Sequence, residues 1–176
     1  SEGLETIGTG AFIGCYRLSS IELPASLTYI GMTAFKDCSE YMSTNGLTAV
    51  TIKSNVLEIE IQAFDGCQKL ATVNFISENP QYLWIRAQAF YNCFALTEIV
   101  LPENTAYIGQ SAFRGTQLAN ITIASTIPPE IITASPDTFE YLGSFLQNIY
   151  VPSASLDAYE EAWALSWVVD RLVAIP

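Results

Sequence analysis

The chain has 176 residues, of which half are apolar, and a net charge of −11 from 18 acidic and 7 basic side chains. This length and apolar content suit one folded domain with a substantial core, which excludes a disordered or fibrous chain. The seven cations are scattered singly, which argues against a nucleic-acid partner or an anionic membrane surface. The apolar runs are too short for direct membrane insertion.

An internal repeat begins within the first residues and continues almost to the C-terminus. Each copy contains a small residue followed by Phe, and the six phenylalanines are Phe12, Phe35, Phe64, Phe90, Phe113 and Phe139. Their spacings of 23, 29, 26, 23 and 26 residues indicate a unit of 23 with short insertions. Stacking of such units predicts that the Phe side chains form an internal spine. No signal-peptide pattern opens the chain, but its first residues already belong to a repeat, so the sequence leaves open whether a leader lies upstream of Ser1.

Each unit also contains a short stretch that alternates apolar, exposed and apolar positions, which predicts a strand with one buried face. These strands are expected at residues 21–23, 50–52, 73–75, 99–101, 121–123 and 149–151. A second apolar pair, such as Leu27 with Ile30, separates each strand from the next Phe. The glycines that follow this pair, Gly8, Gly31 and Gly109, suggest a turn with positive φ. Glu60 and Arg86 occupy the same place in other copies, so the turn does not demand glycine everywhere.

Four cysteines lie three residues after their Phe, and Thr116 continues the row in the fifth copy. Zinc is not indicated, because the chain has no His and no C-x-x-C pair. An even count and rungs roughly 5 Å apart permit a disulfide. However, stacked equivalent side chains point the same way, and Thr has a similar size to Cys. Free buried thiols are therefore the favoured interpretation, with one disulfide as the alternative.

Three insertions interrupt the repeat, at residues 39–46, near 79–81 before Trp84, and from Pro128 to Pro136. Such loops are candidate contact sites, and tolerated surface variation is the other interpretation.

The last segment departs from the repeat. Leu156, Tyr159, Trp163 and Trp167 recur at helical spacing after Ser155, a suitable N-cap. An amphipathic helix here is expected to close the open end of the core, and residues 171–176 are expected to form a short strand. We therefore assign residues 1–152 to the repeats and 153–176 to a capping helix and strand of the same domain.

One unit reads L-x-x-I-x-L-P-x-x-L-x-x-I-G-x-x-A-F-x-x-C, which resembles the BspA-like class of leucine-rich repeats. The resemblance extends from Leu4 to the C-terminus, where the ending also looks like that of the family and implies the native C-terminus. Local departures are Thr116 in the Cys row and Lys53, Ile76 and Ala124 in the Pro row. The resemblance implies an α/β solenoid, a right-handed superhelix with a parallel β ribbon and a C-terminal capping helix. It also implies an exported bacterial protein, at the cell surface or secreted, with a role in adhesion.

Catalytic chemistry is not indicated. Without His, Ser–His and Cys–His pairs are impossible. Glu58 and Glu60 flank Ile59 on one exposed side, and a solvated pair is favoured over a glycosidase site. The sequence contains no glycine-rich phosphate loop and no calcium loop, so neither a cofactor nor a metal is expected.

The outward residues of the predicted ribbon form the candidate binding face. They are Ser20, Glu22, Ala49, Thr51, Thr72, Asn74, Glu98, Val100, Asn120, Thr122, Asn148 and Tyr150. The ligand-binding candidates among them are Glu22, Thr51, Asn74, Glu98, Asn120, Thr122, Asn148 and Tyr150. This face has two acids and no base, which favours a protein backbone or a neutral glycan, possibly host-derived, bound by a monomer. The alternative is a structural spacer or stalk of a larger surface protein.

Overall fold

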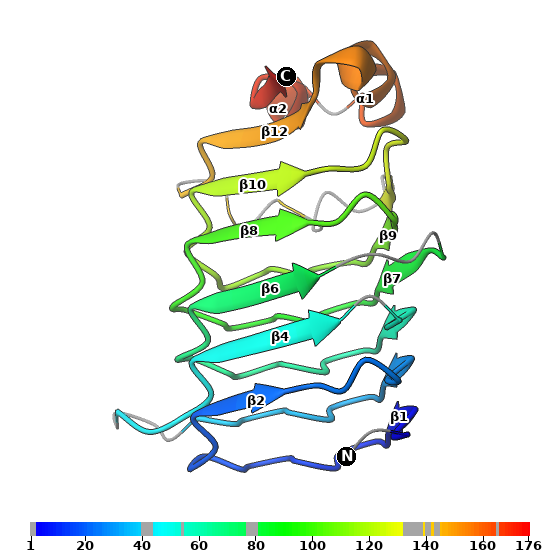
Figure 1. The fold of residues 1–176 in the computed structure, drawn as a ribbon. Helices are drawn as coiled ribbons and strands as arrows, with labels where there is room; N and C mark the ends of the chain where they lie inside the picture. Colours follow the sequence, from blue (N-terminus) through cyan, green and yellow to red (C-terminus); the bar gives the residue numbers. More distant parts are fainter. Residues whose placement is uncertain are drawn as a thin grey trace.

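In the computed structural model the chain winds into a stack of rungs, and each rung contributes one strand to each of two parallel ladders (Figure 1). The structure describes residues 3–39, 44–53, 55–76, 81–131, 139, 142, 145–164 and 166–176, with the side chains of residues 166 and 167 excepted. The solenoid expected from the repeat is therefore confirmed.

The first ladder is the predicted ribbon. It comprises β2 (Ser20–Glu22), β4 (Ala49–Lys53), β6 (Thr72–Ile76), β8 (Glu98–Leu101), β10 (Asn120–Ile123), β12 (Asn148–Pro152) and β13 (Leu172–Ile175). Strands β2, β4 and β6 form one hydrogen-bonded sheet, and β8, β10, β12 and β13 form another. All six strand predictions and the C-terminal strand are confirmed. Strands β6 and β8 lie next to each other. Among the described residues they are not paired by ladder hydrogen bonds, so the ribbon consists of two separate sheets.

The second ladder consists of very short strands on another side of the stack. They are β1 (Thr6–Ile7), β3 (Tyr29–Ile30), β5 (Glu58–Ile59), β7 (Leu83–Ile85), β9 (Thr105–Ile108) and β11 (Glu130–Ile131), paired in parallel in that order. Most are too short to show the alternation that identifies a strand in sequence. Sequence analysis noted the second apolar pair of each repeat but did not predict its place in a six-stranded sheet.

The core between the ladders is organised by the repeated phenylalanines. Phe12, Phe35, Phe64, Phe90 and Phe113 stack in one column, with ring centroids 5.0 to 5.6 Å apart and ring planes within 5°. The last four rings are fully buried. The sixth, Phe139, lies 5.5 Å from the ring of Trp163. The spine that the repeat predicted therefore leads into the C-terminal cap.

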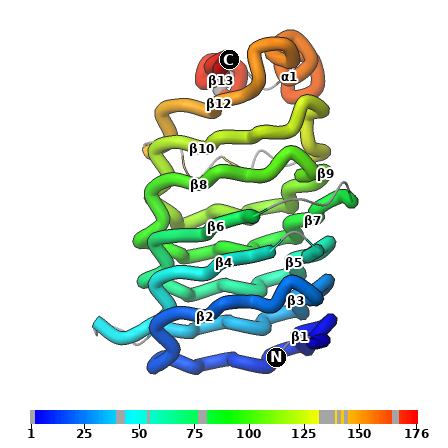
Figure 2. The backbone as a smooth tube through the Cα atoms, viewed as in Figure 1, coloured from blue at the N-terminus to red at the C-terminus, as the bar shows by residue number. Residues whose placement is uncertain are grey.

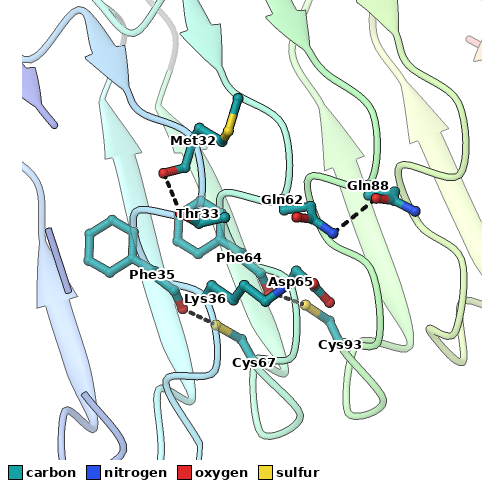
Figure 3. A network of polar contacts seen from close by, with 10 residues as sticks. All are labelled: Met32, Thr33, Phe35, Lys36, Gln62, Phe64, Asp65, Cys67, Gln88 and Cys93. Atoms are coloured by element: carbon teal, nitrogen blue, oxygen red, sulfur yellow. Dashed lines mark hydrogen bonds and ion pairs between the residues drawn. The ribbon is translucent and has the colours of Figure 1, made fainter. Parts of the chain in front are cut away.

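The cysteine row links successive rungs through thiol hydrogen bonds. The thiols of Cys38, Cys67 and Cys93 donate to the carbonyls of Phe12, Phe35 and Phe64, at 3.0, 3.0 and 3.3 Å, and Figure 3 shows the last two.

All four cysteines are free thiols, as the favoured interpretation held. That interpretation was wrong for Cys15 of the first described rung, which is exposed. Thr116 is buried in the same row, but its hydroxyl donates to the carbonyl of its own rung, Phe113, at 2.7 Å.

The turn glycines correct a second expectation. Gly8, Gly31 and Gly109 do not have positive φ. Gly31 and Gly109 instead lie directly against the preceding rung, where an added Cβ would come within 2.8 Å and 2.4 Å of backbone atoms. The left-handed residues lie just before the Ala and two after the Phe, as with Thr33 and Asp37 of the second rung. Glycine is therefore needed at Gly31 and Gly109 for close approach of two backbones.

The C-terminal cap contains a 3-10 turn (Ser153–Ser155), helix α1 (Leu156–Ala162), helix α2 (Ser166–Val169) and β13, which pairs with β12 (Figure 2). The predicted capping helix is confirmed as α1, but the helical spacing continued to Trp167, whereas α1 ends at Ala162 and α2 is a separate helix. Ser155 precedes α1 but makes no side-chain capping bond, since it ends the 3-10 turn with φ −118° and ψ 1°. Tyr159 and Trp163 are buried as predicted, whereas the Trp167 side chain lies outside the described residues.

The insertions are described only in part. Ser39 and Gly46 form an antiparallel bridge that closes the base of the first. Residues 40–43, 77–80 and 132–138 lie outside the described residues. Among the described residues, no helix is both long and apolar enough to span a membrane.

Candidate functional site

The ribbon face displays the side chains that the alternation predicted. Along β4 and β8, successive side chains alternate between solvent-accessible and buried. All twelve predicted outward residues are exposed or half-buried, so the period-two interpretation holds in every rung.

The centre of this face is hollowed by a pocket of about 600 Å³. Six of the eight candidate ligand-binding residues line it: Thr51, Asn74, Glu98, Asn120, Thr122 and Tyr150. Glu22, in the second rung, and Asn148 are not in its lining. Asn148 instead donates to the side-chain oxygen of Asn120 at 3.1 Å, across the paired strands β10 and β12. The volume falls within the roughly 300–1,000 Å³ of pockets that hold small ligands.

The chemistry of the hollow is polar but almost uncharged. Its described lining contains Glu98 as the one acid and no Lys or Arg. Two aliphatic side chains are unusually accessible in it, Ile76 at 50% and Val100 at 58%. The lining therefore combines hydroxyl and amide groups with a small accessible apolar area, a composition that suits hydrogen-bonding ligands better than ions.

The hollow lies across the place where the strand ladder is interrupted. Its lining includes most of β6 on one side and Glu98, Ile99 and Val100 of β8 on the other. Backbone N–H and C=O groups at such a junction need partners other than the neighbouring strand. Sequence analysis missed this junction and Ile76, which occupies the place of the repeat's Pro. That substitution was the one available signal, and it did not by itself predict an exposed side chain.

The outward face of the second ladder carries an aromatic and charged cluster. The Trp84 and Tyr107 rings stack at 5.3 Å, and the Arg86 guanidinium lies 4.8 Å from the centre of Trp84. Arg86 also forms an ion pair with Glu58. Burial and the neighbouring carboxylates of Glu60 and Glu58 raise the pKa of Tyr29.

Glu58 and Glu60 do share one side of β5, but the hypothesis of a solvated pair was wrong for Glu58. Its carboxylate is bound to Arg86 across neighbouring rungs, which gives it a structural partner.

The turn side of the solenoid carries a third polar group of residues, drawn in Figure 3. Lys36 forms a 2.8 Å ion pair with Asp65, and this bond raises the pKa of the lysine. Gln62 donates to Gln88 at 3.0 Å. Each of these two contacts joins corresponding positions in two adjacent rungs, so they help to hold the stack together. Among the described residues, no cluster of three or more acidic, Cys or His side chains is arranged to hold a metal.

Comparison with known proteins identifies the repeat. The sequence model of a family described as "BspA type Leucine rich repeat region" matches six copies, over residues 1–45 and 39–166. The chain belongs to this family. This BspA-type chain is also similar in structure to a leucine-rich cell surface protein from Faecalibacterium prausnitzii A2-165, with 24% identity and a TM-score of 0.51.

The match covers 84% of the BspA-type chain and 43% of that solved protein, so the chain spans less than half of its length. At this identity the likeness establishes the fold alone. A search among curated protein sequences gives no match.

Proposed function

We propose that this chain is a non-catalytic binding module, displayed at the cell surface or secreted, that holds a protein or neutral glycan on its ribbon face. The observation that carries the proposal is the 600 Å³ hollow whose lining joins six outward positions from five rungs. Solenoids commonly use such extended faces for binding. The surface location is supported by the family and by the structural similarity to a leucine-rich cell surface protein. Adhesion is the role these features favour.

The chemistry of the hollow narrows the ligand class. A described lining without Lys or Arg, and with Glu98 as its acid, disfavours phosphate, sulfate and uronic acids. The Asn and Thr side chains provide donors and acceptors, as do backbone groups at the β6–β8 junction. Such groups match sugar hydroxyls or an extended peptide backbone. Binding is therefore expected to depend weakly on salt.

Tyr150 is the main anchor in this proposal. It is a half-buried aromatic at the C-terminal end of the hollow, in register with Thr122 on one side and Val173 on the other. Aromatic side chains provide large contact area and recur among the residues that dominate binding energy. Replacing Tyr150 with Ala should weaken binding about tenfold or more, which corresponds to roughly 1.4 kcal/mol.

The test is to probe glycan and extracellular host-protein arrays with the purified chain and to measure affinity for the hits. Tyr150→Ala should lower affinity and leave the melting temperature nearly unchanged. Tyr16→Ala, which removes an exposed Tyr at the other end of the stack, is the matched control and should bind normally. A sharp fall in melting temperature would assign Tyr150 to the cap. Binding that survives substitution of Tyr150, Asn120 and Asn74 together would refute the ribbon site, and silence on every array would favour a spacer.

A further inference from the structure

A second, smaller pocket opens at the N-terminal ends of β7, β9 and β11, on the ladder that sequence analysis did not predict (Figure 1 labels β7 and β9). Its volume is about 260 Å³. The side chains that define it are Tyr82, Glu103, Asn104, Thr126 and Ile127. None of its lining residues lines the hollow of the ribbon face.

Two local irregularities create this pocket. In β9 the pairing with β7 shifts, because Leu83 pairs with Thr105 whereas the next residue, Trp84, pairs with Tyr107. Ala106 is therefore an extra residue, and such bulges are frequent beside binding sites. In the next rung the Ser125 hydroxyl donates to the Ile127 carbonyl at 2.6 Å and accepts from its amide at 3.3 Å. This tight turn brings Ile127 to the pocket wall.

Three hydrogen bonds hold the segments around the pocket, and the two that come from the C-terminal cap are buried. The Tyr159 hydroxyl of α1 donates to the Ser125 carbonyl at 2.8 Å, and the Trp163 indole donates to the Pro129 carbonyl at 3.0 Å. In the preceding rungs, the exposed Asn104 amide donates to the Gln81 carbonyl at 2.6 Å. Binding to walls held in this way has a smaller ordering cost, which is the usual origin of affinity in small sites.

The exposed side chains at the pocket define its chemistry. Tyr82 is 64% exposed and Ile127 is 70% exposed, although both are large and apolar. They face solvent beside the Glu103 carboxylate and the Thr126 hydroxyl. Among the described lining residues there is no Lys or Arg. The site thus combines an aromatic surface, an aliphatic wall and a few hydrogen-bonding groups.

We propose that this pocket binds one pyranose ring of a neutral glycan. The apolar C–H face of the sugar lies on the Tyr82 ring and against Ile127, and hydroxyl groups donate to the Glu103 carboxylate. The volume is just below the roughly 300–1,000 Å³ typical of drug-sized ligands, so it suits one ring better than an oligosaccharide. A cationic side chain fits less well, because one solvent-exposed carboxylate contributes little to an ion pair.

The test uses the intact chain and three simple probes: the methyl glycopyranosides of glucose, galactose and mannose. The titration is followed by NMR, through the chemical shifts of the backbone amides of Thr105, Ala106 and Ile127, which line the pocket. At least one glycoside should shift these signals saturably, with a millimolar dissociation constant. Tyr82→Ala should raise that constant at least tenfold, and Glu103→Gln by several-fold.

One variant and two probes provide the controls. Tyr16→Ala, an exposed Tyr elsewhere, should leave the glycoside-induced shifts as in the wild type. The three reporter amides lie outside the lining of the ribbon hollow, so this site fails or succeeds independently of the ribbon proposal. Sorbitol has the hydroxyl groups without the ring and should not shift the signals. The proposal is overturned if no glycoside shifts them, if sorbitol does so equally, or if Tyr82→Ala binds unchanged. It is also overturned if N-acetyl-lysine methylamide binds and the glycosides do not.

Discussion

Replacing Phe64 with Ala tests the aromatic spine at its most enclosed point. The Phe64 ring is fully buried, with Phe35 at 5.0 Å on one face and Phe90 at 5.2 Å on the other. Removing a ring of this kind costs about 3–5 kcal/mol, because apolar contacts are lost and the cavity collapses only partly. A typical domain is stable by roughly 5–15 kcal/mol, so the loss is a large share of the total.

Urea unfolding followed by circular dichroism measures this loss. With a slope of about 2 kcal/mol per molar urea, the midpoint should fall by roughly 2 M. Phe12→Ala is the matched control, because that ring is only partly buried and is stacked on a single described neighbour, Phe35. Its cost should be about half as large. A loss below about 1 kcal/mol for Phe64→Ala would mean that the ring is not part of the core.

Three further predictions follow from the packing of the rungs. In the native protein, a thiol reagent should modify the exposed Cys15 quickly and the other three cysteines slowly. The denatured chain without reductant should titrate four thiols. Two fast thiols in the native protein would contradict the buried row. Gly31→Ala should destabilise the fold by about 1–3 kcal/mol in urea unfolding, because the added Cβ would meet backbone atoms at 2.8 Å. Gly8→Ala is the control: it has open space around it and should change stability by less than about 1 kcal/mol. Equal effects would exclude close approach of the backbones as the cause. Burial raises the pKa of both Cys93 and Tyr159, so as pH rises these groups ionise in the unfolded chain before they do in the folded one. The stability that depends on these two groups should therefore be constant below about pH 9 and fall above it. A rise of stability above that pH would contradict this reasoning.

The sequence predicted those parts of the fold that every copy repeats. The Phe spine and the ribbon strands were found because six units impose the same constraint at the same spacing, and the cysteine row was found because four units place Cys three residues after Phe. The second ladder was missed because strands of two residues, such as β5, contain no measurable alternation.

The turn glycines show how one residue type has two structural uses. Gly31 was taken as a positive-φ residue, but it is needed for contact between rungs. One of the two left-handed positions, two residues after each of the first five Phe residues, contains Gly14, Asp37, Gly66, Asn92 and Gly115. Gly, Asn and Asp are the residues that tolerate this conformation, so the signal was present in the sequence.

The candidate sites were less predictable than the rungs. The alternation of exposed and buried residues along each strand placed Asn74, Glu98 and Tyr150 on one face, and in the structure they line one hollow. The shape of that hollow depends on the interrupted pairing of β6 with β8, which no single unit encodes. The second pocket depends on the extra residue Ala106, whose effect appears only when two rungs are placed in register.

The two proposed sites should respond differently to changes in the C-terminal cap. The same two side chains that close the core, Tyr159 and Trp163, hold the carbonyls of Ser125 and Pro129, which flank the wall of the second pocket. Substituting either one therefore changes stability and the shape of that pocket together. The ribbon hollow is built mainly from β6, β8 and β10, whose positions are set by the Phe spine and by strand pairing. Weakening the cap should thus impair sugar binding at the pocket first and leave the centre of the ribbon face in place until the whole stack unfolds.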